Sequence, residues 1–179
     1  MLLETPRLWL TAINANDLNI FHSILANQFV RGYLTDDLEL LPQTSEEMLE
    51  ESLRMFAQEG VGLWLLERKQ NSEIDPEIVS SAKIDPEKIG LVGLWYFFGE
   101  CQPQLIYALL PQWTGQGFAT EAAQAVITCC FDFFGFNYLI ASCDRPNLAS
   151  QNLALRLGMV LVEEKIIEGK PIIFFSLSK

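Results

Sequence analysis

The sequence predicts a single α/β domain in which helices and strands alternate around a mixed sheet. Three observations support this. A long apolar segment from Phe118 to about Phe134 favours a buried helix. Short apolar or alternating runs before it, such as 89–98 and 105–110, indicate strands. The chain has 179 residues, half of them hydrophobic, which suits one domain, 1–179, with a sizeable core.

The first elements follow from local patterns. Residues 7–13 alternate between apolar and polar, which predicts a strand. Asp17 is expected to cap a helix whose apolar face runs from Leu18 to Leu25. Residues 30–43 contain Gly32 and Pro42 and are expected to be irregular.

A second helix and strand should follow. Thr44 and Glu47 have the spacing of a capping box, and apolar residues continue at helical spacing until Gly60. Residues 61–66 then predict a short strand. Residues 69–88 are polar and contain Pro76 and Pro86, which predicts a mobile hairpin insertion between two strands.

The C-terminal part reads as a strand, a helix and a hairpin. Residues 137–143 predict the strand, and Asn147 should cap a short helix that ends at Gly158. Residues 159–166 and 171–177 flank a Glu-Gly-Lys turn and predict a closing hairpin.

Composition restricts the partners. The net charge is −11, which disfavours nucleic acid and anionic membranes and favours a cationic acceptor such as an amine, although it could serve solubility alone. The apolar stretch near Ala125 to Phe134 is too short to span a bilayer, and Glu4 and Arg7 interrupt any signal peptide. Four cysteines without a C-x-x-C pair and a single histidine predict reduced thiols, no metal and a cytoplasmic location.

The central stretch, 109–122, is a strand end, a glycine turn and a helix start. Gly115 and Gly117 permit positive φ and close approach of a ligand, and the helix from Phe118 offers free amide groups to an anion. A P-loop would need Lys and Ser or Thr after the last glycine. A dinucleotide fingerprint would need a third glycine where Thr120 stands. Nucleoside triphosphate hydrolysis and hydride transfer are therefore disfavoured.

Residues 114–122, Thr-Gly-Gln-Gly-Phe-Ala-Thr-Glu-Ala, resemble the acetyl-CoA loop of the GNAT superfamily of N-acetyltransferases. The Ala-Thr-Glu-Ala ending is typical of the branch that contains the ribosomal-protein-alanine acetyltransferases. Residues 4–10, Glu-Thr-Pro-Arg-Leu-Trp-Leu, are similar to the opening strand of that branch. Residues 147–150, Asn-Leu-Ala-Ser, followed by 153–158, are similar to its Asn-x-Ala-Ser…Leu-Gly-Phe segment.

This resemblance implies the GNAT fold, with a mixed, mostly antiparallel sheet of about seven strands and helices on both faces. It implies that the strands ending at Leu110 and Cys143 splay apart around the pantetheine arm of acetyl-CoA. It also implies backbone contacts with the thioester or pantetheine from two residues and with the pyrophosphate from six: Leu109 and Leu110; Thr114, Gly115, Gln116, Gly117, Phe118 and Ala119.

Two further roles are implied near the sulfur. Asn147 would hydrogen-bond the pantetheine arm, or act only as a helix cap, and Ser150 would donate to the leaving thiolate. The family often has Arg, Gln or Trp at Thr114, Glu at Gln104 and a general-acid tyrosine at Ala154, so those functions are missing here. The general base is left open, with four candidates: Glu67, Glu100, Asp144 and a water chain.

The resemblance implies an acetyl-CoA-dependent N-acetyltransferase acting on a primary amine, either a protein or peptide N-terminus or a small molecule. An alternative is a non-catalytic acyl-CoA-binding module of the same fold, which the missing tyrosine and carboxylate motivate. A third is an interaction protein that docks through residues 69–88. Arg145 and Arg156 are candidates for the 3′-phosphate of CoA, although no motif selects them.

Overall fold

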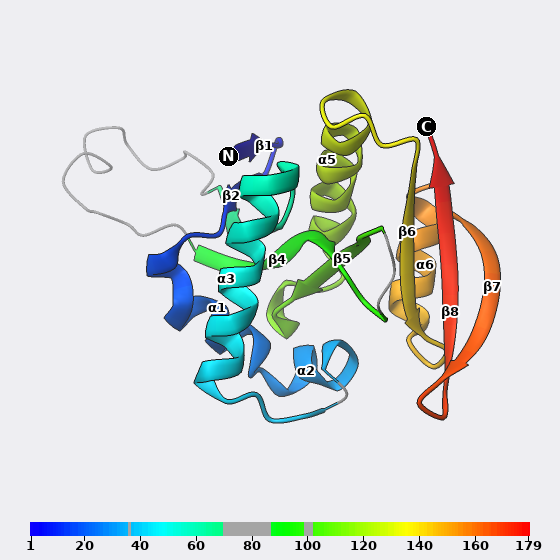
Figure 1. Ribbon diagram of the computed structural model, residues 1–179, viewed down its shortest axis with the longest axis horizontal. Coiled ribbons are helices and arrows are strands. Elements are labelled where there is room, and N and C mark those ends of the chain that lie inside the picture. The colour runs from blue at the N-terminus through cyan, green and yellow to red at the C-terminus, as the bar shows by residue number, and fades with distance from the viewer. Residues whose placement is uncertain (36, 70–86, 99–101) are drawn as a thin grey trace.

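The structure is a computed structural model that describes residues 1–35, 37–69, 87–98 and 102–179 (Figure 1). Most of the insertion predicted for residues 69–88 lies outside the described residues, as does Glu100. The described chain folds around one sheet of eight strands, in the order β1-β2-β3-β4-β5-β6-β8-β7. This is one strand more than the seven expected.

The strands are short, and all neighbours except β5 and β6 pair antiparallel. The short β1, which pairs with β2, has no counterpart among the predicted strands. The strand bounds are β1 Leu2–Glu4, β2 Leu8–Ala12, β3 Leu63–Arg68, β4 Glu87–Trp95, β5 Gln104–Leu109, β6 Tyr138–Asp144, β7 Val160–Ile167 and β8 Lys170–Ser178.

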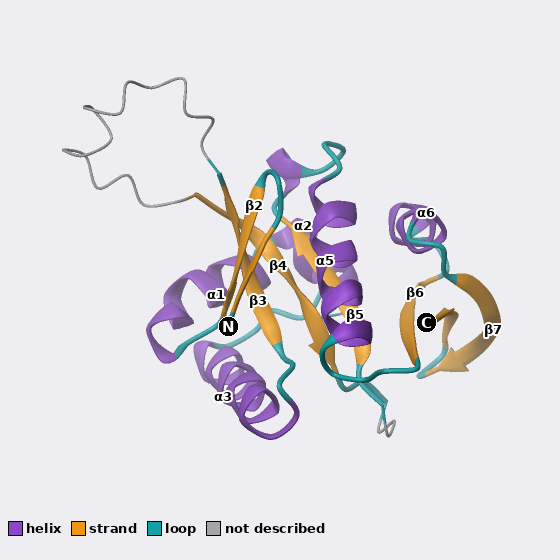
Figure 2. Cartoon of the chain, turned by 90° about the horizontal axis from the view of Figure 1, so that it is seen from above, coloured by secondary structure: helices purple, strands orange, loops and turns teal. Residues whose placement is uncertain are grey.

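Helices cover both faces of the sheet (Figure 2). The helices α1 and α3 pack on one face over Leu63, Leu65, Leu91 and Ile106. The helices α5 and α6 pack on the other face with a larger apolar cluster. The helix bounds are α1 Leu18–Leu25, α2 Gln28–Leu34, α3 Pro42–Glu59, α5 Phe118–Asp132 and α6 Leu148–Arg156, with 3₁₀ turns η1 Ala15–Asp17 and η2 Pro111–Trp113.

The start of the first helical segment differs from the prediction. Asn14, rather than Asp17, is the capping residue, and its side chain accepts a hydrogen bond from the Asn16 amide. Asp17 completes this capping box by accepting from the Asn14 amide at 2.9 Å. The Asp17 side chain makes no cap bond to α1 itself. An Asn-x-x-Asp pair therefore opens a 3₁₀ turn that continues into α1.

Two further predictions in this region were wrong. Residues 30–34, part of the stretch 30–43 expected to be irregular, belong to α2, whose cap is the Asn27 side chain. The helix α3 begins at Pro42 without a side-chain cap, so Thr44 is not a capping residue. Proline is well suited to a first helical position because its missing N–H would have no partner there. Gly60 does end α3, in a left-handed conformation with φ of 76°.

The later elements lie close to their predicted positions. The helix α5 begins at Phe118, and α6 follows Asn147. The helix α5 is not enclosed by the core all round, because the polar residues Gln124, Thr128 and Asp132 recur every four positions and are exposed. The closing hairpin of β7 and β8 also forms as predicted.

The parallel neighbours β5 and β6 are joined over a single pair of residues, Gln104 and Ile140. Beyond this pair the two strands diverge toward their C-terminal ends. The expected splay between the strands that end near Leu110 and Cys143 is therefore present. It leaves the backbone edges of both strands open, next to the start of α5.

Candidate active site

The splay opens into a cavity of about 1320 Å³. Its walls come from α2, the end of β5, the glycine turn, the end of β6, and the first turns of α6. The exposed aromatic residues Phe29 and Tyr33 of α2 lie at its border. One cavity thus connects the glycine turn with the exposed surface of α2.

The glycine turn has the conformation that the spacing predicted. Gly115 and Gly117 have φ values of 72° and 82°, in the left-handed region. Gly117 is the N-cap of α5, and no side chain caps this helix start. A β-carbon at Gly115 would have no atom within 4 Å, which shows that this residue faces open space. The first-turn amides of α5 therefore have the arrangement of an anion site.

Most of the predicted cofactor residues line this cavity. They are Leu109, Thr114, Gly115, Gly117, Ala119 and Asn147, together with the predicted thiolate donor Ser150. Three others do not line it. Phe118 is buried at 5% exposure, Leu110 packs on the opposite side of the sheet, and the Gln116 amide group donates to the Gln112 carbonyl. For Gln116 and Phe118, only a backbone role would agree with this placement.

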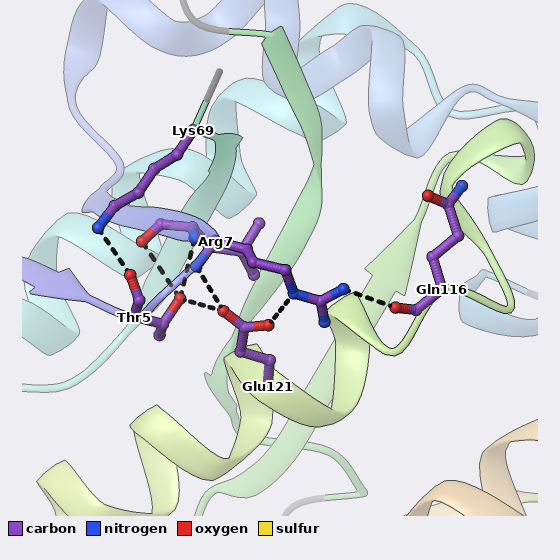
Figure 3. A network of polar contacts seen from close by, with 6 residues as sticks. Thr5, Arg7, Lys69, Gln116 and Glu121 are labelled. Carbon is purple, nitrogen blue, oxygen red and sulfur yellow. Dashed lines mark hydrogen bonds and ion pairs between the residues drawn. The ribbon is translucent and has the colours of Figure 1, made fainter. Parts of the chain in front are cut away.

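A network of polar contacts ties the N-terminal segment to the glycine turn (Figure 3). Glu121, in the first turn of α5, accepts from Arg7 Nε at 2.6 Å, from the Arg7 amide at 2.8 Å, and from Thr5 Oγ1 at 2.6 Å. Arg7 Nη1 donates to the Gln116 carbonyl at 2.9 Å, and the guanidinium lies over the Phe118 ring. The two sequence motifs at residues 4–10 and 114–122 are thus bonded to each other.

The electrostatics of this network suit a neighbouring anion. Burial raises the pKa of Glu121, but hydrogen bonds from Thr5 and Arg7 and the Arg7 charge outweigh this, and the net pKa is lowered. Glu121 also lines the cavity. Its ionised carboxylate would repel a phosphate, and the Arg7 guanidinium compensates that charge. The pair therefore keeps the start of α5 available to a negative ligand.

Asn147 and Ser150 open α6 at the opposite side of the splay. Asn147 Oδ1 accepts from the Ser150 amide at 3.1 Å, so the predicted cap is confirmed. The same bond fixes the first turn of α6, which brings the Ser150 hydroxyl to the cavity wall.

Sequence reasoning missed Tyr107 of β5. Its hydroxyl lies within hydrogen-bonding distance of two Ser150 atoms, Oγ at 2.9 Å and the carbonyl oxygen at 3.1 Å. Burial raises the pKa of Tyr107 to about 12, despite the opposing hydrogen bond from Ser150. Strand alternation was the available signal, because it places Tyr107 on the same face as the predicted cofactor residue Leu109.

A cysteine completes this group. Cys143, near the end of β6, lines the same cavity. Burial raises the pKa of its thiol to about 11, a hydrogen bond with Ser150 opposes this, and Asp144 adds to the increase. The Cys143 thiol and the Ser150 hydroxyl therefore belong to the same wall of the cavity.

The candidate general bases are distributed unevenly. Asp144 lines the cavity. Glu67 is buried at 8% exposure, pairs with Lys88, and does not line it. Glu100 lies outside the described residues. The position of Ala154 is buried at 1% exposure and carries no hydroxyl.

The two arginine candidates differ in their contacts. Arg145 pairs with Glu164 at 2.9 Å, whereas Arg156 lines the cavity. The single histidine, His22, lies between α1 and α3 with its Nδ1 2.9 Å from Ser45 Oγ, which indicates a packing role. Within the described ranges, no three His, Cys, Asp or Glu side chains could hold a metal ion, and no helix could cross a bilayer.

The splayed mixed sheet, with a cavity beside a glycine turn and a helix start, is the arrangement that the resemblance to the GNAT superfamily implied. The chain matches the acetyltransferase (GNAT) domain family over residues 7–160, and it belongs to this family. Members use acetyl-CoA as the acetyl donor.

Similar proteins agree with this assignment. YnaD of Bacillus subtilis (strain 168), an uncharacterized N-acetyltransferase, is 30% identical over 71 residues, which cover 40% of this chain and 42% of YnaD. A GNAT-family acetyltransferase from Bordetella pertussis has a TM-score of 0.81 at 19% identity and covers 99% of both chains. A RimL ribosomal-protein acetyltransferase, in complex with coenzyme A bound to a cysteine of that protein by a disulfide, has a TM-score of 0.77 at 14% identity, covering 99% and 98% of the two chains.

Proposed function

We propose that this protein transfers an acetyl group from acetyl-CoA to a primary amine, by direct attack within a ternary complex. The observation that carries this proposal is the shared cavity, which has free helix-start amides at one end and the Ser150 hydroxyl in its wall. A diphosphate at the first site and a thioester near the second suit a ligand of the acetyl-CoA type. The backbone edges exposed by the splay of β5 and β6 provide partners for the pantetheine amides.

The reaction needs no covalent enzyme intermediate. The neutral amine attacks the thioester carbonyl carbon, the C–S bond breaks, and the thiolate leaves while the new amide nitrogen loses a proton. Holding both substrates in one cavity supplies the positioning. Ser150 would donate a hydrogen bond to the leaving thiolate.

The proton of the amine needs an acceptor. Asp144 is the candidate carboxylate that lines the cavity, and a water chain is the other route. An α-amino group, with a pKa of about 8, is partly neutral at physiological pH and needs little help. This favours the N-terminus of a protein or peptide as acceptor. The ribosomal-protein activity named for RimL supports the same choice, with a small amine as the second option.

A non-catalytic acyl-CoA-binding module is the second candidate. The buried Ala154, which replaces a tyrosine hydroxyl, favours it. Both candidates predict binding of acetyl-CoA, whereas only the enzyme releases free thiol when an amine is supplied.

The experiment that separates them has two parts. Isothermal titration calorimetry first measures CoA binding to the purified protein. Thiol release is then followed with acetyl-CoA and a panel of N-terminal peptides and small amines. We expect binding together with thiol release for at least one acceptor. Binding without release from any acceptor would support the module, and no binding would contradict both.

A further inference from the structure

The hydroxyl groups of Tyr107 and Ser150 lie close enough to share a hydrogen bond, and its direction determines where the Ser150 hydrogen points. Tyr107 carries one hydroxyl hydrogen and has two acceptors within reach, Ser150 Oγ at 2.9 Å and the Ser150 carbonyl at 3.1 Å. The carbonyl can only accept. The atom that accepts the Tyr107 hydrogen therefore determines the direction of the Ser150 hydroxyl hydrogen.

Two arrangements are open. If Tyr107 donates to the carbonyl, the Ser150 hydroxyl donates back to Tyr107 and its hydrogen is turned away from a ligand. If Tyr107 donates to Ser150 Oγ, the serine hydrogen is released toward a sulfur atom. A thiolate in the cavity can only accept hydrogen bonds, so it favours the second arrangement, which the 2.9 Å distance between the Tyr107 hydroxyl and Ser150 Oγ allows.

We infer that Tyr107 is a positioning residue, which donates to Ser150 Oγ and thereby directs the serine hydrogen at the thiolate that leaves during acetyl transfer. This inference rests on the proposed function. It identifies a role for a hydroxyl on β5 that no sequence motif selects, in a chain whose α6 has alanine where relatives have a general-acid tyrosine.

Tyr107 is not the acid itself. Its pKa of about 12 lies well above that of an ordinary thiol, which is about 8.5. A thiolate would therefore not take the Tyr107 proton at equilibrium. The residue acts by keeping its hydrogen and stabilising the thiolate through Ser150, which should lower the pKa of a thiol bound in the cavity.

The test measures that pKa directly and needs no acceptor. The ultraviolet absorbance of the thiolate is titrated in the CoA complex, with the desulfo-CoA complex as reference. Because the ionisable groups around the pair, Cys143, Asp144 and Arg156, are present in both complexes, their contributions cancel. The variants are Tyr107→Phe, Ser150→Ala, both together, and Ser150→Thr. Tyr138→Phe removes a hydroxyl from a half-exposed ring outside the cavity and is the matched control.

We expect the bound thiol pKa to increase by about 1 in Tyr107→Phe and in Ser150→Ala. The double variant should equal Ser150→Ala alone, because the tyrosine acts through the serine. Ser150→Thr and Tyr138→Phe should retain the bound thiol pKa of the unchanged protein. In a kinetic assay, Tyr107→Phe should lower kcat and leave KM for acetyl-CoA within about twofold.

Other results would overturn the inference. The inference is wrong if Tyr107→Phe leaves the bound thiol pKa unchanged. It is also wrong if the pKa shifts of the two single variants add in the double variant. If CoA binds but no amine releases thiol, the proposed acetyl transfer fails, while the thiol pKa still decides the role of Tyr107. If Tyr107→Phe does not fold, the inference is overturned by an equal bound thiol pKa in Ser150→Ala and in the unchanged protein.

Discussion

Single residues in this site combine structural and chemical roles. Asn147 caps α6, and the same bond places Ser150 at the cavity wall. The cap was recognisable in the sequence because asparagine favours a helix start, and the serine was recognisable through the family resemblance. Tyr107 was not recognisable, because its role depends on a contact across 43 residues of sequence. Local patterns predict local bonds, and this one forms only once β5 and α6 meet.

Ser150 provides the first prediction at this scale. Ser150→Ala should lower turnover by roughly 10- to 100-fold, the value of a hydrogen bond to a charged group, and should change acetyl-CoA affinity far less. Initial rates and calorimetry on the same preparation measure both quantities. Ser23→Ala, an exposed serine of α1, is the control. Unchanged turnover would exclude a thiolate-donor role.

Gly115 provides the second prediction, with Gly135 as a matched control. Both have positive φ, 72° and 70°, and at neither would a β-carbon meet an atom within 4 Å. Each Gly→Ala substitution should therefore destabilise the fold by about 1 kcal/mol through backbone strain alone.

The two variants should differ in ligand binding. Only Gly115→Ala should weaken CoA binding, because Gly115 lines the cavity. Urea unfolding and calorimetry provide the comparison. Equal CoA affinities for the two variants would argue against an anion site at this turn.

At the scale of elements, the start of α5 is held by the segment between β1 and β2. Thr5 and Arg7 bond to Glu121, and Arg7 reaches the Gln116 carbonyl, so the loop before β2 fixes the glycine turn. The sequence contained both motifs, but nothing in it showed that they touch. Helix starts at Asn14 and Pro42 were also misassigned, because several residues nearby could serve as caps and only tertiary packing selects between them.

The pKa of Glu121 leads to a prediction about acid stability. Because this pKa is lowered in the folded state, the carboxylate contributes stability above its unfolded value of 4.5, and the contribution is lost as the pH falls through the lower folded value. Glu121→Gln should therefore lower Tm at neutral pH. The difference in Tm from the unchanged protein should shrink below about pH 4.5.

Thermal unfolding followed by circular dichroism across this pH range tests the prediction. Glu50→Gln, an exposed carboxylate on α3, should show no such convergence. A Tm difference that is constant with pH would mean that the Glu121 charge contributes nothing.

For the whole molecule, the order of motifs predicted the fold class, the single sheet and a site between its splayed strands. The resemblance supplied the topology, which periodicity alone could not. The strand count was one too low because β1 has only three residues, too few for an alternating pattern. The α2 border of the cavity was the least predictable part, since its cap Asn27 has no capping-box partner and Val30 is its one buried residue.

The net charge of −11 should steer a cationic acceptor toward the cavity. We expect kcat/KM for an amine acceptor to fall as salt is raised to about 0.5 M, where screening is nearly complete over protein dimensions. Thiol-release rates in a salt series, with a neutral and a cationic peptide of equal length, provide the measurement. An equal salt response for both peptides would show that the charge serves solubility alone.

The single rung between β5 and β6 has a practical consequence. The pantetheine arm of coenzyme A contains amide bonds, so it can pair with both strands in the gap and join the two halves of the sheet. The empty protein is then the weaker form, and backbone amides along both open edges should exchange with deuterium more slowly once the gap is filled. Purification and crystallisation in the presence of coenzyme A should accordingly yield the more uniform material.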